Sequence, residues 1–172
     1  SKHIILLLSA LLFVSALTFE KIARKRSSDF TGIVQKAGAE LQQLEKTSRQ
    51  HLQQVAQQLI SRKSVQGSDF SSLSAIPSDP WLSVFIYRND SIVWWSDNNI
   101  LPGKKEFQPG FRFYRNGWYE YMVVDAGIYK VAGMLKIKNE YAFQNRFLSN
   151  SFHPCLRLPS SAVILKTHSE NS

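Results

Sequence analysis

Aromatic side chains crowd one stretch of this chain, and a few charged residues lie beside them in the sequence. The aromatic residues between positions 94 and 129 include Trp94, Trp95, Phe111, Phe113, Tyr114, Trp118, Tyr119, Tyr121 and Tyr129. Neighbouring residues of a β-strand point to opposite faces, so Trp94 and Trp95 cannot both fill the same core. One tryptophan is therefore left for a pocket, a partner or the underside of the loop at residues 97–110.

We predict a ligand site between this loop and one face of a β-sheet, where aromatic walls meet a few charges. The candidate ligand-binding residues are Trp94, Trp95, Asp97, Arg112 and Tyr119. Such a combination of apolar walls and a few polar groups suits a small polar ligand. The alternative interpretation is that most of the rings are core fillers and that the charges belong to a solvated loop.

The sequence offers little support for catalysis or for a cofactor. Its four histidines, His3, His51, His153 and His168, stand at no helical i, i+3 or i, i+4 spacing from one another, and there is one cysteine. A zinc or haem constellation is therefore not predicted, and no intrachain disulfide can form. Neither a Gly-rich phosphate loop after a strand nor a nucleophile elbow occurs. We expect a non-catalytic chain without cofactors or metal.

Residues 3–19 carry no charge, and a cluster of cations follows them: Lys21, Arg24, Lys25 and Arg26. With a rise of about 1.5 Å per residue, such a helix spans roughly 25 Å, close to a hydrocarbon core of about 30 Å. We predict a transmembrane or signal-anchor helix at residues 3–19, with the cations against anionic lipid. The alternative is a secretory signal cleaved after the small residues 14–16.

The formal net charge is +8, and half of this excess lies beside the predicted span. The remaining charge forms no basic stripe with interleaved aromatic residues, so nucleic acid is not expected as a partner.

The segment at residues 27–64 is predicted to be one long helix that continues from the membrane. It is rich in Gln, Leu, Glu, Ala and Lys and contains no proline. Its apolar residues step by three or four positions: Phe30, Ile33, Val34, Ala37, Leu41, Leu44, Leu52, Val55 and Leu59. This stripe indicates one buried face, and the same stripe can also pair two copies in a homodimer.

Residues 80–160 are predicted to form an antiparallel sheet of about five strands. A hairpin at 82–87 and 91–96 turns at residues 88–90, and a meander follows at 111–114, 118–124 and 128–137. Gly133 falls on the apolar face of the last strand, where it permits a close approach or marks a bulge. We expect a short helix at 140–151, one more strand at 162–165, and a tail at 161–172 that leads to a region absent from this chain. The fold class is α+β.

Four segments give the chain a family resemblance. They are residues 87–98 (YRNDSIVWWSDN), 116–119 (NGWY), 137–145 (IKNEYAFQN) and 147–152 (FLSNSF). Together they resemble the extracytoplasmic N-terminal region of bacterial transmembrane sensor histidine kinases, with a PAS- or Cache-like sensor domain. The resemblance implies a cell-membrane protein whose domain lies outside the cytoplasm, and a signal passed to a cytoplasmic kinase.

These 172 residues contain no His box, no nucleotide-binding motif and no second membrane span, so we expect a fragment of such a receptor. The larger basic cluster follows the span and by the loop-charge rule would favour the cytoplasm for that side; the composition and the resemblance favour the outside. No ligand motif of the family can be carried over to named residues. Two functions remain open: a sensory input domain for a small-molecule or protein signal, and a membrane-anchored structural or protein-interaction module without ligand sensing.

Overall fold

The structure is a computed structural model of the whole chain. It describes residues 2–61, 70, 73–74, 79–100, 102 and 108–165, and the side chains from residue 30 onward. The chain divides into two compact units, residues 1–39 and 40–172. The helix α1 (Lys2–Ser61) makes up the described part of the first unit and continues into the second.

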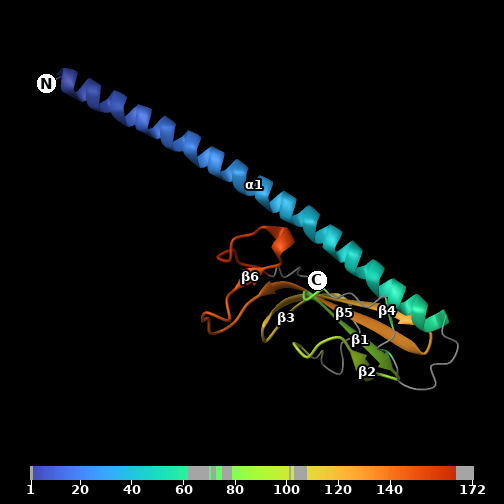
Figure 1. Cartoon of the computed structure of the whole chain (residues 1–172). Coiled ribbons are helices and arrows are strands. Elements are labelled where there is room, and N and C mark those ends of the chain that lie inside the picture. Colours follow the sequence, from blue (N-terminus) through green and yellow to red (C-terminus); the bar gives the residue numbers. More distant parts are fainter. Residues whose placement is uncertain are drawn as a thin grey trace, which may run out of the picture. The chain divides into compact units, whose positions relative to one another are not determined.

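The second unit combines the end of α1 with an antiparallel sheet (Figure 1). The strands are β1 (Leu82–Arg88), β2 (Ser91–Trp95), β3 (Gly110–Tyr114), β4 (Gly117–Ala126), β5 (Tyr129–Asn139) and β6 (Ser151–Phe152). The order is β2-β1-β5-β4-β3, and the short β6 pairs with the end of β5. The predicted α+β class and the five-stranded antiparallel sheet are thus confirmed, and the arrangement is compatible with a PAS- or Cache-like fold.

The hairpin between β1 and β2 forms where the sequence predicts it. Asn89 and Asp90 both have positive φ, at 48° and 62°, as a two-residue type I′ turn requires. The register pairs Arg88 with Ser91 and then shifts between Ile86 and Tyr87. This shift sets Ile86 against Trp94 and Phe85 against Trp95.

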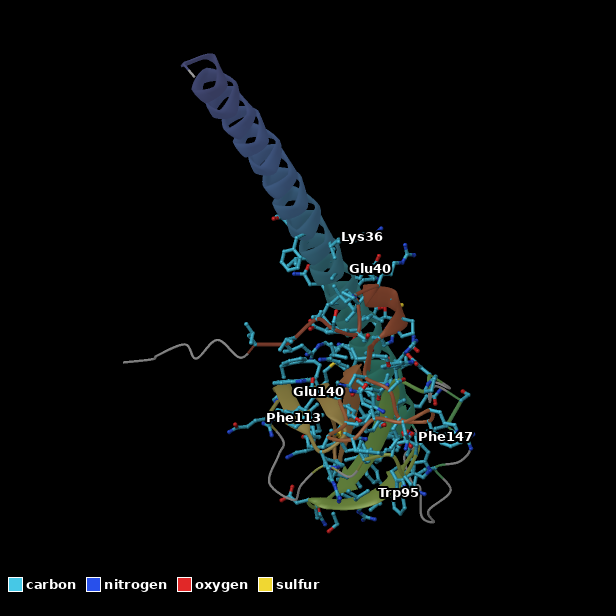
Figure 2. The ribbon with its side chains drawn as sticks, turned by 90° about the vertical axis from the view of Figure 1, so that its left-hand side faces the viewer. Lys36, Glu40, Trp95, Phe113, Glu140 and Phe147 are labelled. Atoms are coloured by element: carbon cyan, nitrogen blue, oxygen red, sulfur yellow. The ribbon has the colours of Figure 1, made fainter. Side chains whose placement is uncertain are left out.

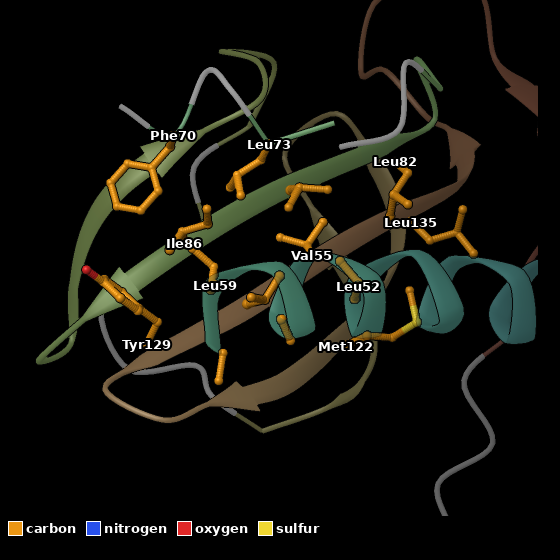
Figure 3. Close-up of a cluster of buried hydrophobic side chains, with 14 of the residues drawn as sticks. Leu52, Val55, Leu59, Phe70, Leu73, Leu82, Ile86, Met122, Tyr129 and Leu135 are labelled. Atoms are coloured by element: carbon orange, nitrogen blue, oxygen red, sulfur yellow. The ribbon is translucent and has the colours of Figure 1, made fainter. Parts of the chain in front are cut away.

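One face of the sheet is buried under α1 (Figure 3). Leu52, Val55 and Leu59 project from the helix into a core that includes Val131 and Leu135 of β5, all of them almost inaccessible to solvent. The later part of the helical stripe, from Leu41 to Leu59, and the alternation in β5 therefore meet as predicted. Burial of this apolar surface is the main favourable term that holds the helix on the sheet. The start of the predicted stripe is not buried: Phe30, Ile33 and Val34 are exposed.

Gly133 decides how closely the helix approaches the sheet. A Cβ atom at this position would lie 2.7 Å from Cδ1 of Leu52 and 3.0 Å from Cδ2. Of the two roles that the sequence leaves open, the structure assigns the close approach. The Leu52 side chain occupies the space that any larger residue would need.

The opposite face of the sheet, the outer face, is also buried, which the sequence pattern did not predict. It holds a second cluster rich in aromatic side chains: Phe85, Tyr87, Tyr119, Tyr121, Ala132 and Met134. Half-buried residues from the flanking segments pack against it, among them Ile100 after β2 and Tyr114 at the end of β3. The predicted mixed face is therefore a second core, and the connecting segments must cover it.

Two predicted elements are absent from the described residues. Residues 140–150 form no helix, because side chains take the backbone amides that a helix would use: Asn145 Oδ1 accepts from the amides of Phe147 and Leu148, and Gln144 accepts from the amide of Asn150. Such local bonds compete with helix formation. The strand expected at 162–165 is also wrong, since these residues have no regular structure. Instead, β6 and the 3-10 helix η2 (Pro154–Leu156) follow.

Among the residues whose side chains are described, no helix is long and apolar enough to cross a membrane. The predicted span at residues 3–19 and the basic cluster at 21–26 lie in the part of α1 whose side chains are outside the description.

We expect Gly133→Ala to lower the free energy of unfolding by about 1–3 kcal/mol, because the added methyl group overpacks the contact with Leu52. Leu52→Ala alone should cost about 2–5 kcal/mol through the cavity it leaves. In the double variant the two effects should fall short of their sum, because the cavity accepts the methyl group. Urea unfolding of a fragment that begins at Ser27 measures all three. Strict additivity would contradict the close approach.

Candidate functional site

A hollow opens on the outer face of the sheet, with a volume of about 530 Å³. This lies within the range of small-molecule sites. The residues that line it come from three separate segments: Asn99 and Ile100 after β2; Tyr114, Arg115 and Asn116 at the turn between β3 and β4; and Tyr141, Ala142, Phe143 and Leu148 after β5. We call it the Asn116 pocket.

Asn116 connects the segments that form this pocket. Its Nδ2 donates to the carbonyl oxygen of Asn99 at 3.4 Å, and its Oδ1 accepts from the hydroxyl of Tyr119 at 3.0 Å. Its backbone oxygen accepts from the amide of Glu140 at 3.2 Å. Gly117 lets the chain turn directly after Asn116, because its φ is 154° and a Cβ would collide with the carbonyl oxygen of Lys138.

Two tyrosine rings pack against each other beneath the pocket. Tyr119 is fully buried, and its ring meets that of Tyr114 edge to face at 5.5 Å. Burial raises the pKa of the Tyr119 hydroxyl well above its ordinary value, so it stays protonated and donates to Asn116. Above the ring lies the ammonium group of Lys136 at 5.5 Å, and burial lowers the pKa of this lysine.

The rim is apolar and open to solvent. Phe143 is 73% exposed and Leu148 is 39% exposed, although both are large apolar residues. Exposed apolar groups that border a hollow mark interaction sites more often than isolated surface residues do. The pocket therefore has the form of a binding site, with apolar walls and a few polar groups.

The predicted site residues lie elsewhere. Trp94 packs against the core beneath α1, whereas Trp95 is 45% exposed and donates its indole N–H to Asn98 Oδ1 at 2.6 Å. The two tryptophans thus point to opposite faces. Arg112 lies on β3 and donates to the carbonyl oxygen of Gln108 at 2.9 Å. Trp95 lies on β2 and Arg112 lies on β3, and these two strands are the opposite edges of the five-strand order. The other three strands therefore lie between Trp95 and Arg112. Figure 2 labels Trp95 of β2 and Phe113 of β3, the residue that follows Arg112, at different places on the sheet.

The other two predicted residues support the pocket without lining it. Asp97 Oδ1 accepts from the amide of Asn99 at 2.8 Å, and Oδ2 accepts from the hydroxyl of Ser96 at 3.2 Å, so the carboxylate shapes the turn that presents Asn99. Tyr119 orients Asn116. Lys104 and Lys105, in the loop predicted to cover the site, are outside the described residues.

Sequence reasoning missed all of the lining residues. Four of them fell on the expected helix at 140–151, which would have placed them differently: Tyr141, Ala142, Phe143 and Leu148. The available signal was the density of asparagine and glutamine in that stretch, which favours side-chain bonds to the backbone over a helix.

A buried cation joins one wall of the pocket to the last described segment of the chain. The Nζ of Lys138 donates to Glu140 Oε2 at 2.8 Å and to the carbonyl oxygen of Ala162 at 3.0 Å. The indole N–H of Trp118 donates to the same carboxylate oxygen at 3.1 Å. We call Lys138, Glu140, Trp118 and Ala162 the Lys138 cluster. The hydrogen bond from Lys138 lowers the pKa of Glu140, the residue directly before the pocket residue Tyr141.

Within the part of the chain that the structure describes, no three His, Cys, Asp or Glu side chains lie close enough to hold a metal ion. Comparisons of the chain with protein-family models, with curated proteins and with solved structures found no match.

Lys138→Met should detach the segment around Ala162, because it removes the donor that holds this carbonyl oxygen. Hydrogen exchange of the amides at 162–165 should then become faster, and the free energy of unfolding should fall by about 1.5–3 kcal/mol, as expected for a hydrogen bond to a charged group. Lys130→Met is the matched control, since Lys130 is 41% exposed and 4.0 Å from Asp90. Equal effects in both variants would remove the special role of Lys138.

His153 should make the fold sensitive to mild acid. It is 5% exposed, its ring meets that of Trp81 at 4.9 Å, and its Nδ1 accepts from the amide of Cys155 at 3.3 Å. Burial lowers its pKa below the ordinary 6.5, and Asp79 offsets part of this. At a pH between the lowered pKa of the folded state and the ordinary pKa of the unfolded state, His153 binds a proton in the unfolded chain but not in the folded chain.

The free energy of unfolding should therefore fall as the pH drops from 7.5 to 5.5, by at most about 1.4 kcal/mol per pH unit. Urea unfolding at several pH values measures the slope. His153→Asn keeps a side-chain acceptor for the Cys155 amide and should flatten it; an unchanged slope would assign the pH dependence to another group.

Proposed function

We propose that this chain is the extracytoplasmic signal-input domain of a membrane-bound sensor histidine kinase, and that the Asn116 pocket receives a small-molecule signal. The observation that carries the proposal is the pocket itself. It combines an organised polar turn with exposed Phe143 and Leu148. The sequence resemblance to sensor kinases supports the same class, and the helix-on-sheet architecture is compatible with it.

In this proposal residues 3–19 anchor the domain in the cell membrane, and Lys21, Arg24, Lys25 and Arg26 contact its anionic lipids. The domain then lies outside the cytoplasm. Ligand binding at the pocket shifts the equilibrium between two conformations of the domain. The transmembrane segments transmit this conformational change to a kinase.

The Lys138 cluster couples the pocket to the segment at residues 158–165 in this proposal. A ligand that draws Tyr141 and Phe143 inward also moves Glu140, because it is the adjacent residue. Glu140 shares Lys138 with the carbonyl oxygen of Ala162, so the position of the segment at 158–165 responds to the pocket. This segment also packs on the core beneath α1 through Leu158 and Ile164. A change there reaches both the helix and the downstream chain.

A second candidate function rests on α1. Phe30, Ile33 and Val34 are all close to half exposed or more, which favours an interaction module whose helix pairs with α1 of a second copy. The two functions differ in ligand dependence. A sensor changes its hydrogen exchange around the pocket when the signal is added, whereas an interaction module has a constant partner on the helix.

We expect Phe143→Ala, combined with Leu148→Ala, to abolish the signal-dependent change in autophosphorylation of the intact receptor in membrane vesicles. Both side chains are exposed, so the melting temperature should shift by no more than a few degrees. Phe147→Ala is the control, because Phe147 is 77% exposed but does not line the pocket. A full response in the double variant would exclude the pocket and favour the helix.

A further inference from the structure

We propose that the Asn116 pocket takes an organic anion: a carboxylate whose remaining body is apolar or aromatic. The inference rests on the proposed function, because it assigns a ligand class to the same pocket.

The charge of the pocket favours an anion. Of the described residues that line it, Arg115 is the only one that carries a charge, and none is acidic. Its side chain is exposed and has no hydrogen bond or ion pair with the described residues. A guanidinium group binds a carboxylate through two parallel N–H donors, which gives both affinity and orientation.

The carboxylates closest in sequence to the lining segments form no ion pair with Arg115. The negative charge of Asp97 acts on Lys136, whose ammonium group lies over the Tyr119 ring. Both oxygens of Asp97 accept from its own turn, from Ser96 and Asn99. Glu140 accepts from Lys138 and Trp118. Among the described residues, none pairs with the positive charge of Arg115, which can therefore bind a ligand.

A second donor, Asn99, lies on another of the lining segments. The backbone amide of Asn99 donates to Asp97, and its backbone oxygen accepts from Asn116. None of the described residues forms a hydrogen bond with the side-chain amide of Asn99. The amide of Asn99 can thus donate to one carboxylate oxygen while Arg115 holds the other. Asn116 is different, since Tyr119 and Asn99 already engage its amide.

The rest of the wall selects an apolar body. Tyr114, Tyr141 and Phe143 are aromatic, and Ile100 and Leu148 are aliphatic. An aromatic or branched aliphatic group of the ligand would cover Phe143 and Leu148, which are otherwise open to water. A small hydrophilic acid such as acetate leaves them uncovered.

Aromatic walls also attract organic cations, which form the alternative ligand class. A quaternary ammonium ion over tyrosine and phenylalanine rings gains cation–π energy. Here it would lie beside the guanidinium of Arg115 with no lining carboxylate to compensate. The like charge favours the anion.

Isothermal titration of the full chain in lipid nanodiscs tests the ligand class. The probes are phenylacetate, indole-3-acetate and hexanoate, the neutral amide of each, acetate, and phenyltrimethylammonium. We expect at least one of the three larger carboxylates to bind about tenfold or more tightly than its own amide, and acetate to bind weakly.

Arg115→Gln should weaken the binding of that carboxylate by about tenfold to a hundredfold, the loss of affinity expected when a charged hydrogen-bonded pair is removed. Its binding of the amide should change little. Arg146→Gln is the matched control, because Arg146 is exposed, contacts the Phe147 ring at 4.5 Å and does not line the pocket.

The outcomes separate this inference from the proposed function. If amides bind as tightly as carboxylates, or if the ammonium ion binds best, the anion assignment is wrong but the pocket remains a ligand site. If Arg115→Gln leaves carboxylate binding unchanged, the assignment is also wrong. If no probe binds the chain, both the ligand class and the role of the pocket in sensing lose their support.

Discussion

The contact between Leu52 and Gly133 determines how the rest of the second unit is arranged. A helix can approach a sheet more closely where the strand beneath it has no side chain, and β5 offers that space at Gly133. The Leu52 side chain fills it, and Val55 and Leu59 then reach Val131 and the neighbouring apolar residues. Because β5 is the central strand, this one contact orients the helix against the whole sheet.

Because α1 covers only one face of the sheet, other parts of the chain must cover the outer face. Phe85, Tyr119 and Tyr121 on the outer face are buried without any help from α1. Connecting segments have to cover them, and such segments carry backbone groups that need partners. Asparagine side chains supply many of these partners, with Asn116 and Asn145 as the clearest cases. The Asn116 pocket lies where three of the connecting segments meet.

The two polar centres of the domain have different tasks. Asn116 holds the segments of the pocket together through neutral hydrogen bonds, which are individually weak and can rearrange. Lys138 is a buried cation whose partners are a carboxylate and a backbone oxygen, an arrangement that is costly to break. Glu140 belongs to both centres, through its backbone amide and its side chain. Glu140 is thus the residue that connects the two centres.

Local patterns in the sequence determined the elements that depend on neighbouring residues. The stripe from Leu41 to Leu59 predicted the buried helix face, the alternation in β5 predicted its apolar side, and Asn89-Asp90 predicted the tight hairpin turn. Trp94 and Trp95 were correctly expected on opposite faces. Each of these follows from a periodicity or a turn preference that a few adjacent residues express.

Only the tertiary structure decided where the pocket lies. The predicted convergence of Trp95 with Arg112 depended on the strand order, and the order places their strands at opposite edges of the sheet. Residues 140–151 have the apolar spacing of a helix, yet their asparagine and glutamine side chains bond to the backbone and turn Tyr141 and Phe143 toward the hollow. Strand order is settled by contacts between distant parts of the chain, and a single segment contains no information about it. The side-chain bonds within residues 144–150 are local, and their signal in the sequence is the density of asparagine and glutamine.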